Sequence, residues 1–246
     1  MYPAVEKEQR QRICTVCERL YQKGLIAAGD GNVSVRVSDG QVLVTPSGFH
    51  KGFIRPADLC VADLSGRRLR GDHNPSSEFA MHALVYKERA DVSSVVHAHP
   101  PFVVALALAG VPLVDCVLSE TCLLLGPVPT ASYSTPTTQE VPDSLRPFVR
   151  KANAIVMQRH GALTMGRTVE EAWQRMEALE HAAKIIHAAR MLGEVTPLPA
   201  RDTQKLEQLA EQLGIPRPPT AFAAPTHDAD EHALIEAVLR KLGVRS

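Results

Sequence analysis

The sequence predicts a protein of the α/β class, in which helices and short strands alternate along one chain. Apolar and polar residues alternate over 33–37, which is the period of a half-buried strand. Apolar residues recur at helical spacing over 168–193, the clearest helical segment of the chain. The 246 residues, 45% of them hydrophobic, are enough for one large domain with a substantial core.

The composition argues against several classes of protein. The 27 basic residues balance 27 acidic ones, so the charge does not favour nucleic acid or a charged membrane surface as a partner. The longest apolar stretch, 102–109, is far too short to cross a bilayer. The charged N-terminal segment does not resemble a signal peptide. The five cysteines, an odd number, predict free thiols in a reducing compartment and hence a cytoplasmic protein.

The N-terminal segment predicts a helix over 6–24, in which apolar residues recur at helical spacing as far as Gly24. Cys14 and Cys17 have the spacing of a zinc or redox pair. Because no second pair completes a zinc site, we interpret both cysteines as packing residues.

A β-hairpin follows, with strands over 33–37 and 41–45. The loops that enter and leave it, 29–32 and 45–48, consist of small residues. Small residues let backbone amides approach a ligand closely, although each loop taken alone is also an ordinary turn.

The segment 75–100 combines two kinds of site. Ser76 and Ser77 stand where a helix should begin, and a helix N-terminus with free N–H groups and two hydroxyls can bind an anion. His97 and His99 lie in a predicted strand, so their side chains share a face and could bind one metal ion. Histidines that hydrogen-bond within a core would give the same pattern. Together the two sites predict an enzyme that acts on a phosphorylated small molecule.

Helices over 78–90 and 101–110 are expected on either side of this histidine strand. His82, in the first of them, is interpreted as structural. Buried strand segments are expected over 111–118 and 123–125.

Further along, a helix is expected around 145–149 and a buried strand over 154–157. This strand delivers His160 at its end, which makes His160 the best candidate for a third imidazole. A capping box at 168–171 opens the long helix that ends at Gly193.

Three imidazoles with an open position form the usual arrangement of catalytic zinc. The natural fourth group is Glu78, which follows Ser76 and Ser77. It is either a ligand or a base, depending on what else is bound.

The composition changes beyond residue 196, so we divide the chain into a catalytic domain, 1–196, and a helical tail, 197–246. The tail is expected to contain a charged helix over 201–213 and an amphipathic segment over 231–242. It is expected to pack on the body or on a neighbouring subunit.

Five motifs carry a resemblance to a known family: Gly31-Asn32-Val33-Ser34, Thr45-Pro46-Ser47-Gly48, Pro75-Ser76-Ser77-Glu78, His97-Ala98-His99 and Gln158-Arg159-His160-Gly161. In this order, and over about residues 8–193, the chain resembles the class II aldolase/adducin family, and within it the L-fuculose-phosphate aldolases. The tail is not covered by the resemblance.

The resemblance implies a three-layer α/β/α fold with a mostly antiparallel central sheet, and a cyclic homotetramer with active sites at subunit interfaces. It implies zinc, with manganese or cobalt as alternatives, bound by His97, His99 and His160. Glu78 would be the catalytic acid/base and also a ligand in the resting enzyme. The substrate phosphate would be held by Gly31, Asn32, Ser47, Gly48, Ser76 and Ser77.

The implied reaction is the cleavage of a ketose 1-phosphate, such as fuculose 1-phosphate, to dihydroxyacetone phosphate and an aldehyde. Zinc would stabilise the enediolate as a Lewis acid, and Glu78 would exchange the C–H proton, which requires a raised pKa. A decarboxylase or dehydratase of a related sugar phosphate or sugar acid phosphate is the alternative. A pentulose 5-phosphate 4-epimerase is less favoured, because aspartate is expected there instead of Glu78. A non-catalytic, adducin-like interaction module would lack the histidines.

The chain departs from the family pattern at its proton donor. The tyrosine that serves as donor in the family falls near Cys116 here, and Tyr133 is the nearest tyrosine downstream. Glu120 is a candidate replacement acid, and it is equally well interpreted as a surface carboxylate. The second family tyrosine, near the C-terminus, has no counterpart. The surroundings of Phe222 are a candidate for closing over the substrate, since the C-terminus of relatives can reach the active site.

Overall fold

The computed structural model describes residues 4–113 and 115–216. Its strands are β1 (Asn32–Ser38), β2 (Gln41–Val44), β3 (Cys60–Asp63), β4 (Arg68–Arg70), β5 (Ser94–Ala98), β6 (Thr130–Ala131), β7 (Ala154–Met157) and β8 (Gly161–Gly166). Its α-helices are α1 (Ala4–Gln22), α2 (Phe79–Glu88), α3 (Pro101–Leu108), α4 (Ser119–Leu124), α5 (Glu140–Val149), α6 (Val169–Leu192) and α7 (Ala200–Gln212). Two short 3-10 helices are η1 (Lys51–Phe53) and η2 (Pro56–Asp58).

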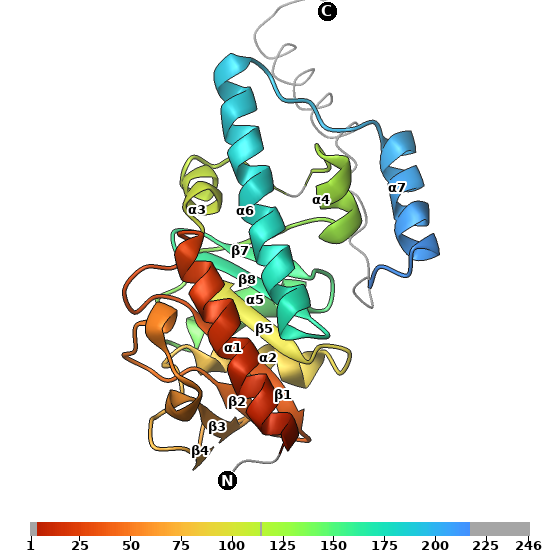
Figure 1. Cartoon of the computed structure of the whole chain (residues 1–246). Helices are drawn as coiled ribbons and strands as arrows, with labels where there is room; N and C mark the ends of the chain where they lie inside the picture. Colours follow the sequence, from red (N-terminus) through yellow and green to blue (C-terminus); the bar gives the residue numbers. More distant parts are fainter. Residues whose placement is uncertain (1–3, 114, 217–246) are drawn as a thin grey trace, which may run out of the picture.

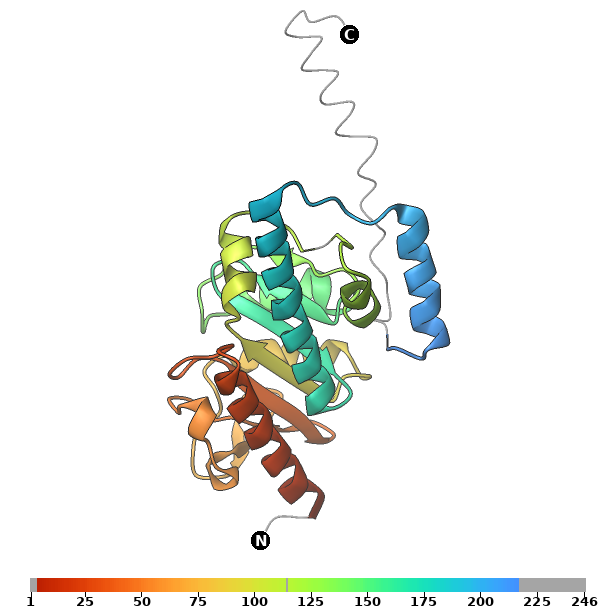
Figure 2. The ribbon, with the colours of Figure 1, turned by 45° about the horizontal axis from the view of Figure 1, so that its top comes forward.

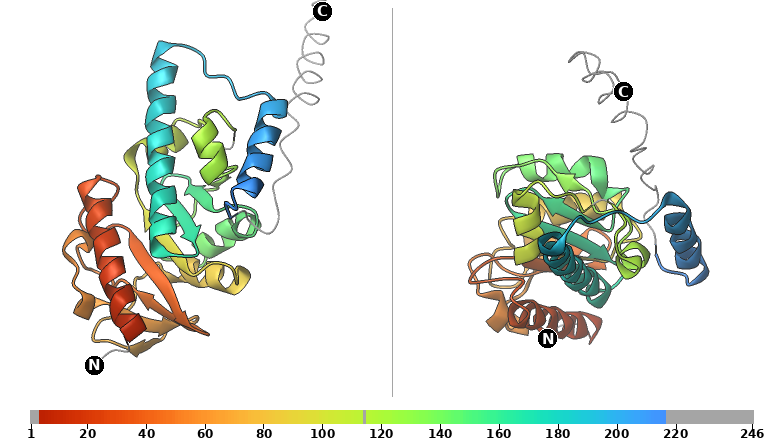
Figure 3. Two further views of the ribbon diagram at one scale, coloured as in Figure 1. Left: turned by 45° about the vertical axis from the view of Figure 1, so that its right-hand side comes forward. Right: turned by 90° about the horizontal axis from the view of Figure 1, so that it is seen from above.

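The strands form one eight-stranded sheet in the order β4-β3-β2-β1-β5-β8-β7-β6. Neighbouring strands are antiparallel except β6 and β7, which run parallel. Helices α1 and α6 lie side by side on one face of the sheet together with α3 (Figures 1 and 2), and α2 and α5 cover the other face. Seen from above, the sheet lies between α6 and α5 (Figure 3). The predicted three-layer fold with a mostly antiparallel sheet is confirmed.

Strand alternation divides the side chains of β1 between the two faces. Val33 and Val35 belong to the core under α1 and α6. Ser34 points to the opposite face, where it meets His82 and Tyr86 of α2. The polar side of β1 therefore faces the helix that follows Glu78.

The capping box predicted at 168–171 forms only in part. The Thr168 hydroxyl accepts from the backbone N–H of Glu171 at 3.1 Å, as a helix N-cap requires. The carboxylate of Glu171 accepts instead from the backbone N–H of Arg167, and it also pairs with Arg175. The long helix ends at Leu192 with Gly193 as its C-cap, as predicted.

The strand segments predicted over 111–118 and 123–125 are wrong. Residues 119–124 form helix α4, and Leu113 pairs only in an isolated bridge with Val128. Apolar runs this short have no readable period, so strand and helix cannot be distinguished from the pattern.

The tail packs on the body as far as it is described. Helix α7 matches the helix predicted over 201–213 and lies beside α4 (Figure 1). The backbone N–H of Leu198 donates to the carbonyl of Cys116 at 2.7 Å, and the side chain of Asn153 donates to the carbonyl of Pro216 at 3.1 Å. The predicted segment 231–242 and Phe222 lie outside the described residues.

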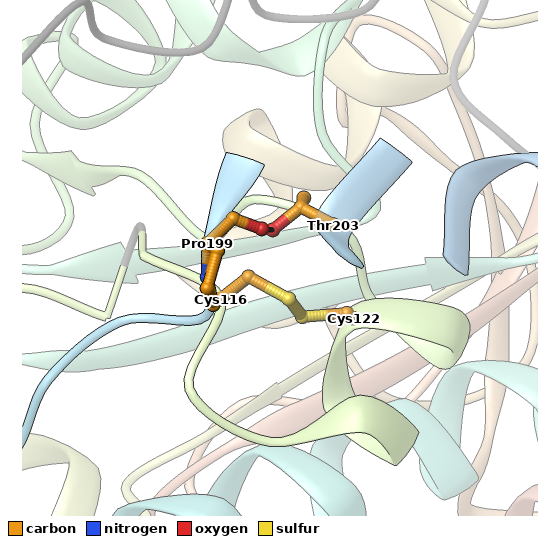
Figure 4. The surroundings of a disulfide bond; sticks show 4 residues. All are labelled: Cys116, Cys122, Pro199 and Thr203. Carbon is orange, nitrogen blue, oxygen red and sulfur yellow. Dashed lines mark hydrogen bonds between the residues drawn. A yellow bond between two sulfur atoms is a disulfide. The ribbon is translucent and has the colours of Figure 1, made fainter. Parts of the chain in front are cut away.

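Cys14 and Cys17 are free and buried in α1, and burial raises the pKa of the Cys14 thiol to about 12. Their interpretation as packing residues is confirmed. Cys116 and Cys122 form a disulfide that lies near Pro199 and Thr203 at the start of α7 (Figure 4). The prediction of free thiols is therefore wrong for Cys116 and Cys122. The loop before α4 brings Cys116 beside Cys122, which lies in that helix. Among the described residues, no helix has the length and apolar character needed to span a bilayer.

Candidate metal centre and anion site

The three predicted histidines converge at one edge of the sheet. His97 is in β5, His99 follows β5, and His160 is in the turn between β7 and β8. Strand β5 pairs with β8 so that Ala98 lies opposite Ala162, which brings the start of β8 beside the end of β5. One nitrogen of each ring lies within 4.8 Å of the other two. The sheet register therefore assembles the cluster from two separate segments.

The rings are oriented by contacts on their outer nitrogens. His97 Nδ1 donates to the carbonyl oxygen of Ala162 at 3.0 Å, and His99 Nδ1 lies 3.4 Å from a carboxylate oxygen of Asp30. The Nε2 atoms of the two rings face each other at 3.0 Å. A carbonyl or carboxylate on the outer nitrogen is the typical support of a metal-binding histidine, because it leaves the inner nitrogen free to bind.

Glu78, the N-cap residue of α2, faces this cluster. Its Oε1 lies 3.1 Å from His160 Nε2, and its Oε2 lies 3.4 Å from His97 Nε2. Burial alone would raise the pKa of Glu78, but the hydrogen bonds with His160 and His97 outweigh burial and hold this pKa below its usual range. The raised pKa that acid/base catalysis requires concerns Glu78 after it has left the metal, and it stays a prediction.

The residues present fit a divalent metal ion. Burial, followed by the charge of His97, lowers the pKa of His99 to about 4, so its imidazole is in the neutral form that binds metals. Three imidazole nitrogens and one carboxylate are a donor set that zinc and related metals accept. His160 Nδ1 is buried and has no hydrogen-bond partner in the described part of the chain.

Two glycines allow the histidines to pack this closely. A Cβ at Gly161 would collide with the carbonyl of Ala98 and stand 2.7 Å from the ring of His99. Gly31 has a φ of +69°, and a Cβ there would stand 2.8 Å from the carbonyl of His97. Both motifs therefore need glycine for physical reasons.

The two serine-containing loops predicted to bind phosphate lie side by side. Pro46 and Pro75 form an antiparallel bridge, and the backbone N–H groups of Ser47 and Ser76 donate to carbonyls of the opposite loop at 3.1 Å. Because these two N–H groups are used in the pairing, the loops would offer an anion their hydroxyls and the neighbouring N–H groups of Gly48 and Ser77. Ser76 is buried and Ser77 is exposed.

Asn32 connects the first loop to the cluster. It lies opposite His97 in the register of β1 and β5, and its Nδ2 donates to Glu78 Oε2 at 3.0 Å. Gly31 precedes it in the chain. These two residues therefore lie where the predicted phosphate and metal sites meet.

Sequence reasoning missed Lys51, which is only 3% exposed. Its ammonium group donates to the carbonyls of Gly29 and Phe49, both at 2.8 Å, and so joins the loop before β1 to the loop after β2. Burial lowers the pKa of Lys51. No sequence pattern marks a buried lysine, since its partners are main-chain carbonyls.

Tyr133 and Glu120, the two residues considered in place of the family's tyrosine donor, differ in position. The backbone N–H of Tyr133 donates to the side chain of Gln158 at 3.3 Å, so Tyr133 lies beside the segment that carries His160, and its side chain is 56% exposed. Glu120 is exposed on α4, which packs against α6 and α7. In residues 4–113 and 115–216, no hydrogen bond or ion pair joins Glu120 to the histidine cluster.

A three-layer fold with three histidines and a glutamate beside small-residue loops defines a class of metal-binding proteins. Residues 11–187 match the family described as Class II Aldolase and Adducin N-terminal domain. The chain belongs to this family.

Three relatives illustrate its range. The chain is 27% identical over 212 residues to a 5-deoxy-D-ribulose 1-phosphate aldolase of Bacillus thuringiensis serovar kurstaki, covering 85% of this chain and 98% of the relative. It is 29% identical over 189 residues to a 3-oxo-tetronate 4-phosphate decarboxylase of Escherichia coli K12, and the match covers 75% of this chain and 89% of the relative. A solved structure of an L-fuculose 1-phosphate aldolase superposes with a TM-score of 0.78 at 27% identity, covering 87% of this chain and 98% of that one.

Proposed function

We propose that the protein is a metal-dependent class II aldolase that cleaves a ketose 1-phosphate to dihydroxyacetone phosphate and an aldehyde. The observation that carries the proposal is the position of Glu78, whose carboxylate lies 3.1 Å from His160 and 3.4 Å from His97. A carboxylate at the edge of a metal cluster can exchange a proton with a carbon atom of a bound substrate.

In this proposal His97, His99 and His160 hold the metal ion, and Glu78 is a fourth ligand in the resting enzyme. The nitrogen-rich donor set favours zinc, with manganese or cobalt as alternative occupants. When bound, the ion supplies Lewis-acid polarisation of the substrate carbonyl.

The protein's own groups carry the other tasks. Glu78 returns a proton to the carbon next to the carbonyl in cleavage, and removes it in the synthetic direction. The N–H that Asn32 donates to Glu78 orients the carboxylate for that transfer. The buried charge of Lys51 balances part of the phosphate charge. The phosphate is held by Gly31, Asn32, Ser47, Gly48, Ser76 and Ser77.

The proton donor for the departing aldehyde half is proposed from position. Tyr133 is the better candidate, since its backbone is tied to Gln158 near the cluster. Glu120 is the weaker one and would have to act from the surface of α4.

The names of the relatives support a small phosphorylated sugar as the substrate. Two of them are named for ketose 1-phosphates, 5-deoxyribulose 1-phosphate and fuculose 1-phosphate. A decarboxylase of a sugar acid phosphate is the second candidate, supported by the similarity to the 3-oxo-tetronate 4-phosphate enzyme.

We further propose a cytoplasmic homotetramer with active sites at subunit interfaces. The free buried thiols and the phosphorylated substrate support a cytoplasmic location. The Cys116–Cys122 disulfide argues against it, because disulfides are rare in reducing compartments. Light scattering on the purified protein tests the assembly, and a monomer would contradict it.

Product analysis of metal-loaded protein tests the reaction. Wild type and Glu78→Gln are incubated with 5-deoxyribulose 1-phosphate, fuculose 1-phosphate and 3-oxo-tetronate 4-phosphate. Release of dihydroxyacetone phosphate from either ketose 1-phosphate by wild type, and not by Glu78→Gln, establishes the aldolase. Release of carbon dioxide from the third compound, with no cleavage of the other two, would replace it with the decarboxylase.

A further inference from the structure

A continuous chain of hydrogen bonds runs from Glu78 into the core between β1 and α2. After the bond from Asn32 to Glu78, His82 Nε2 lies 2.5 Å from Asn32 Oδ1. His82 Nδ1 lies 2.6 Å from the hydroxyl of Ser34, which lies 2.8 Å from the hydroxyl of Tyr86. Asn32, Ser34, His82 and Tyr86 are at most 3% exposed.

Each bond in this chain has a defined direction. An ionised carboxylate only accepts, so the amide nitrogen of Asn32 faces Glu78 and its oxygen faces His82. That oxygen also only accepts, so His82 carries its proton on Nε2. A neutral His82 then accepts at Nδ1 from the Ser34 hydroxyl, which in turn accepts from Tyr86. All donors therefore point toward Glu78.

The neutral form of His82 agrees with its surroundings. Burial, followed by the charge of His97, lowers the pKa of His82 to about 3. With one donor and one acceptor nitrogen, the ring satisfies both Asn32 and Ser34 at the same time. No other uncharged side chain offers these two functions on opposite sides of one rigid ring.

We propose that His82 is a positioning residue, which holds the carboxamide of Asn32 with its nitrogen toward Glu78. Without the donor at Nε2, the amide can turn its oxygen toward the carboxylate, where two acceptors repel each other. Glu78 would then lose its oriented partner, and the second N–H of Asn32 would no longer be fixed for a substrate anion. The inference rests on the proposed function in taking Glu78 and Asn32 as parts of the site.

The alternative is that His82 only fills space in the core. Two substitutions separate these roles, because the amide of glutamine overlaps the Nε2 position of histidine and the amide of asparagine overlaps the Nδ1 position. His82→Gln keeps a donor for Asn32, whereas His82→Asn keeps a partner for Ser34 and leaves Asn32 unsupported. Both variants bury one amide group at residue 82, so they differ mainly in which neighbour that amide reaches.

The experiment measures zinc affinity, by competition with a chelator, and the unfolding midpoint of both variants, with His181→Asn on the exposed face of α6 as a control. We expect His82→Asn to lose about 10–100-fold in zinc affinity. His82→Gln should stay within about threefold of wild type, and the unfolding midpoints of the two variants should be similar. If both variants lose affinity equally, or neither does, His82 has no positioning role.

A kinetic measurement completes the test. His82→Asn should lower kcat by a similar factor of about 10–100 and leave KM less affected, since Glu78 is the group displaced. If wild type cleaves none of the ketose 1-phosphates while the zinc affinities still separate the two variants, the proposed function fails and the positioning role stands. If wild type is active and the variants do not separate, the positioning role fails alone.

Discussion

At the scale of single residues, the histidine cluster depends on the absence of a side chain at position 161. A Cβ there would stand 2.7 Å from the His99 ring and 3.1 Å from the His97 ring. The rings cannot retreat freely, because His97 Nδ1 is bonded to the carbonyl of Ala162. The geometry of the cluster is therefore set by Gly161 as much as by the imidazoles.

Gly161→Ala is expected to reduce zinc affinity by about 10–100-fold, because the added methyl group displaces the rings. Gly193→Ala is the matched control, since no atom lies within 4 Å of the Cβ that it would add. Zinc content after dialysis against a chelator is the measurement. Full retention of zinc by Gly161→Ala would show that the rings adjust without cost.

Because His82 is buried in its neutral form, the stability of the folded protein is expected to depend on pH. Its folded-state pKa is about 3, whereas the ring takes up a proton near pH 6.5 in the unfolded chain. The unfolded state therefore binds more protons between these values, and stability falls as the pH drops below about 6.5. Between pH 7 and pH 5 the titration of this ring should lower the free energy of unfolding by about 2 kcal/mol.

Urea unfolding of wild type and His82→Gln at both pH values, with chelator present, measures this loss. The variant should lose about 2 kcal/mol less than wild type on acidification, because glutamine does not titrate. The same loss in both proteins would mean that His82 is protonated in the folded state.

At the scale of secondary-structure elements, the site is made where loops meet. Lys51 joins the loop before β1 to the loop after β2, and a bridge between Pro46 and Pro75 adds the loop before α2. Three segments that are distant in sequence thereby form one surface beside Glu78.

Lys51→Met removes this link while keeping most of the apolar stem. We expect inorganic phosphate to bind about 10-fold or more weakly, because both the charge and the joint between the loops are lost. Lys23→Met, at an exposed lysine paired with Glu177, is the control. Calorimetric titration with phosphate gives the affinities, and unchanged binding would exclude Lys51 from the anion site.

The length of each element decided whether it could be predicted from the sequence. Strand and helix periods were readable where a pattern ran long enough, as in α1, β1 and α6. The short helix α4 and the disulfide beside it could not be predicted from the sequence, because tertiary packing decides both. The triad and Glu78 were predicted through motifs. His82 is buried and hydrogen-bonded, in agreement with its structural interpretation, but its partners Asn32 and Ser34 could not be read from the sequence because they come from a strand that lies far away along the chain.

At the scale of the whole molecule, the candidate site and the tail use different parts of the sheet. The site lies where β5 ends and β8 begins, whereas the tail contacts α4, the carbonyl of Cys116 and the side chain of Asn153, which precedes β7. This separation supports the division of the chain into 1–196 and 197–246, which we now propose as a division into a metal-binding body and a stabilising tail.

A chain that ends at residue 196 tests the division. It loses the bond from Leu198 to Cys116, and it leaves Asn153 and the buried Arg175 without the carbonyl of Pro216. Two or three such bonds correspond to about 1–4 kcal/mol, so the unfolding midpoint should fall by several degrees while the protein still binds zinc. A chain that ends at residue 216 keeps every described contact and isolates the effect of 197–216. Loss of zinc from the chain that ends at 196, with its fold intact by circular dichroism, would mean that the tail helps to build the site.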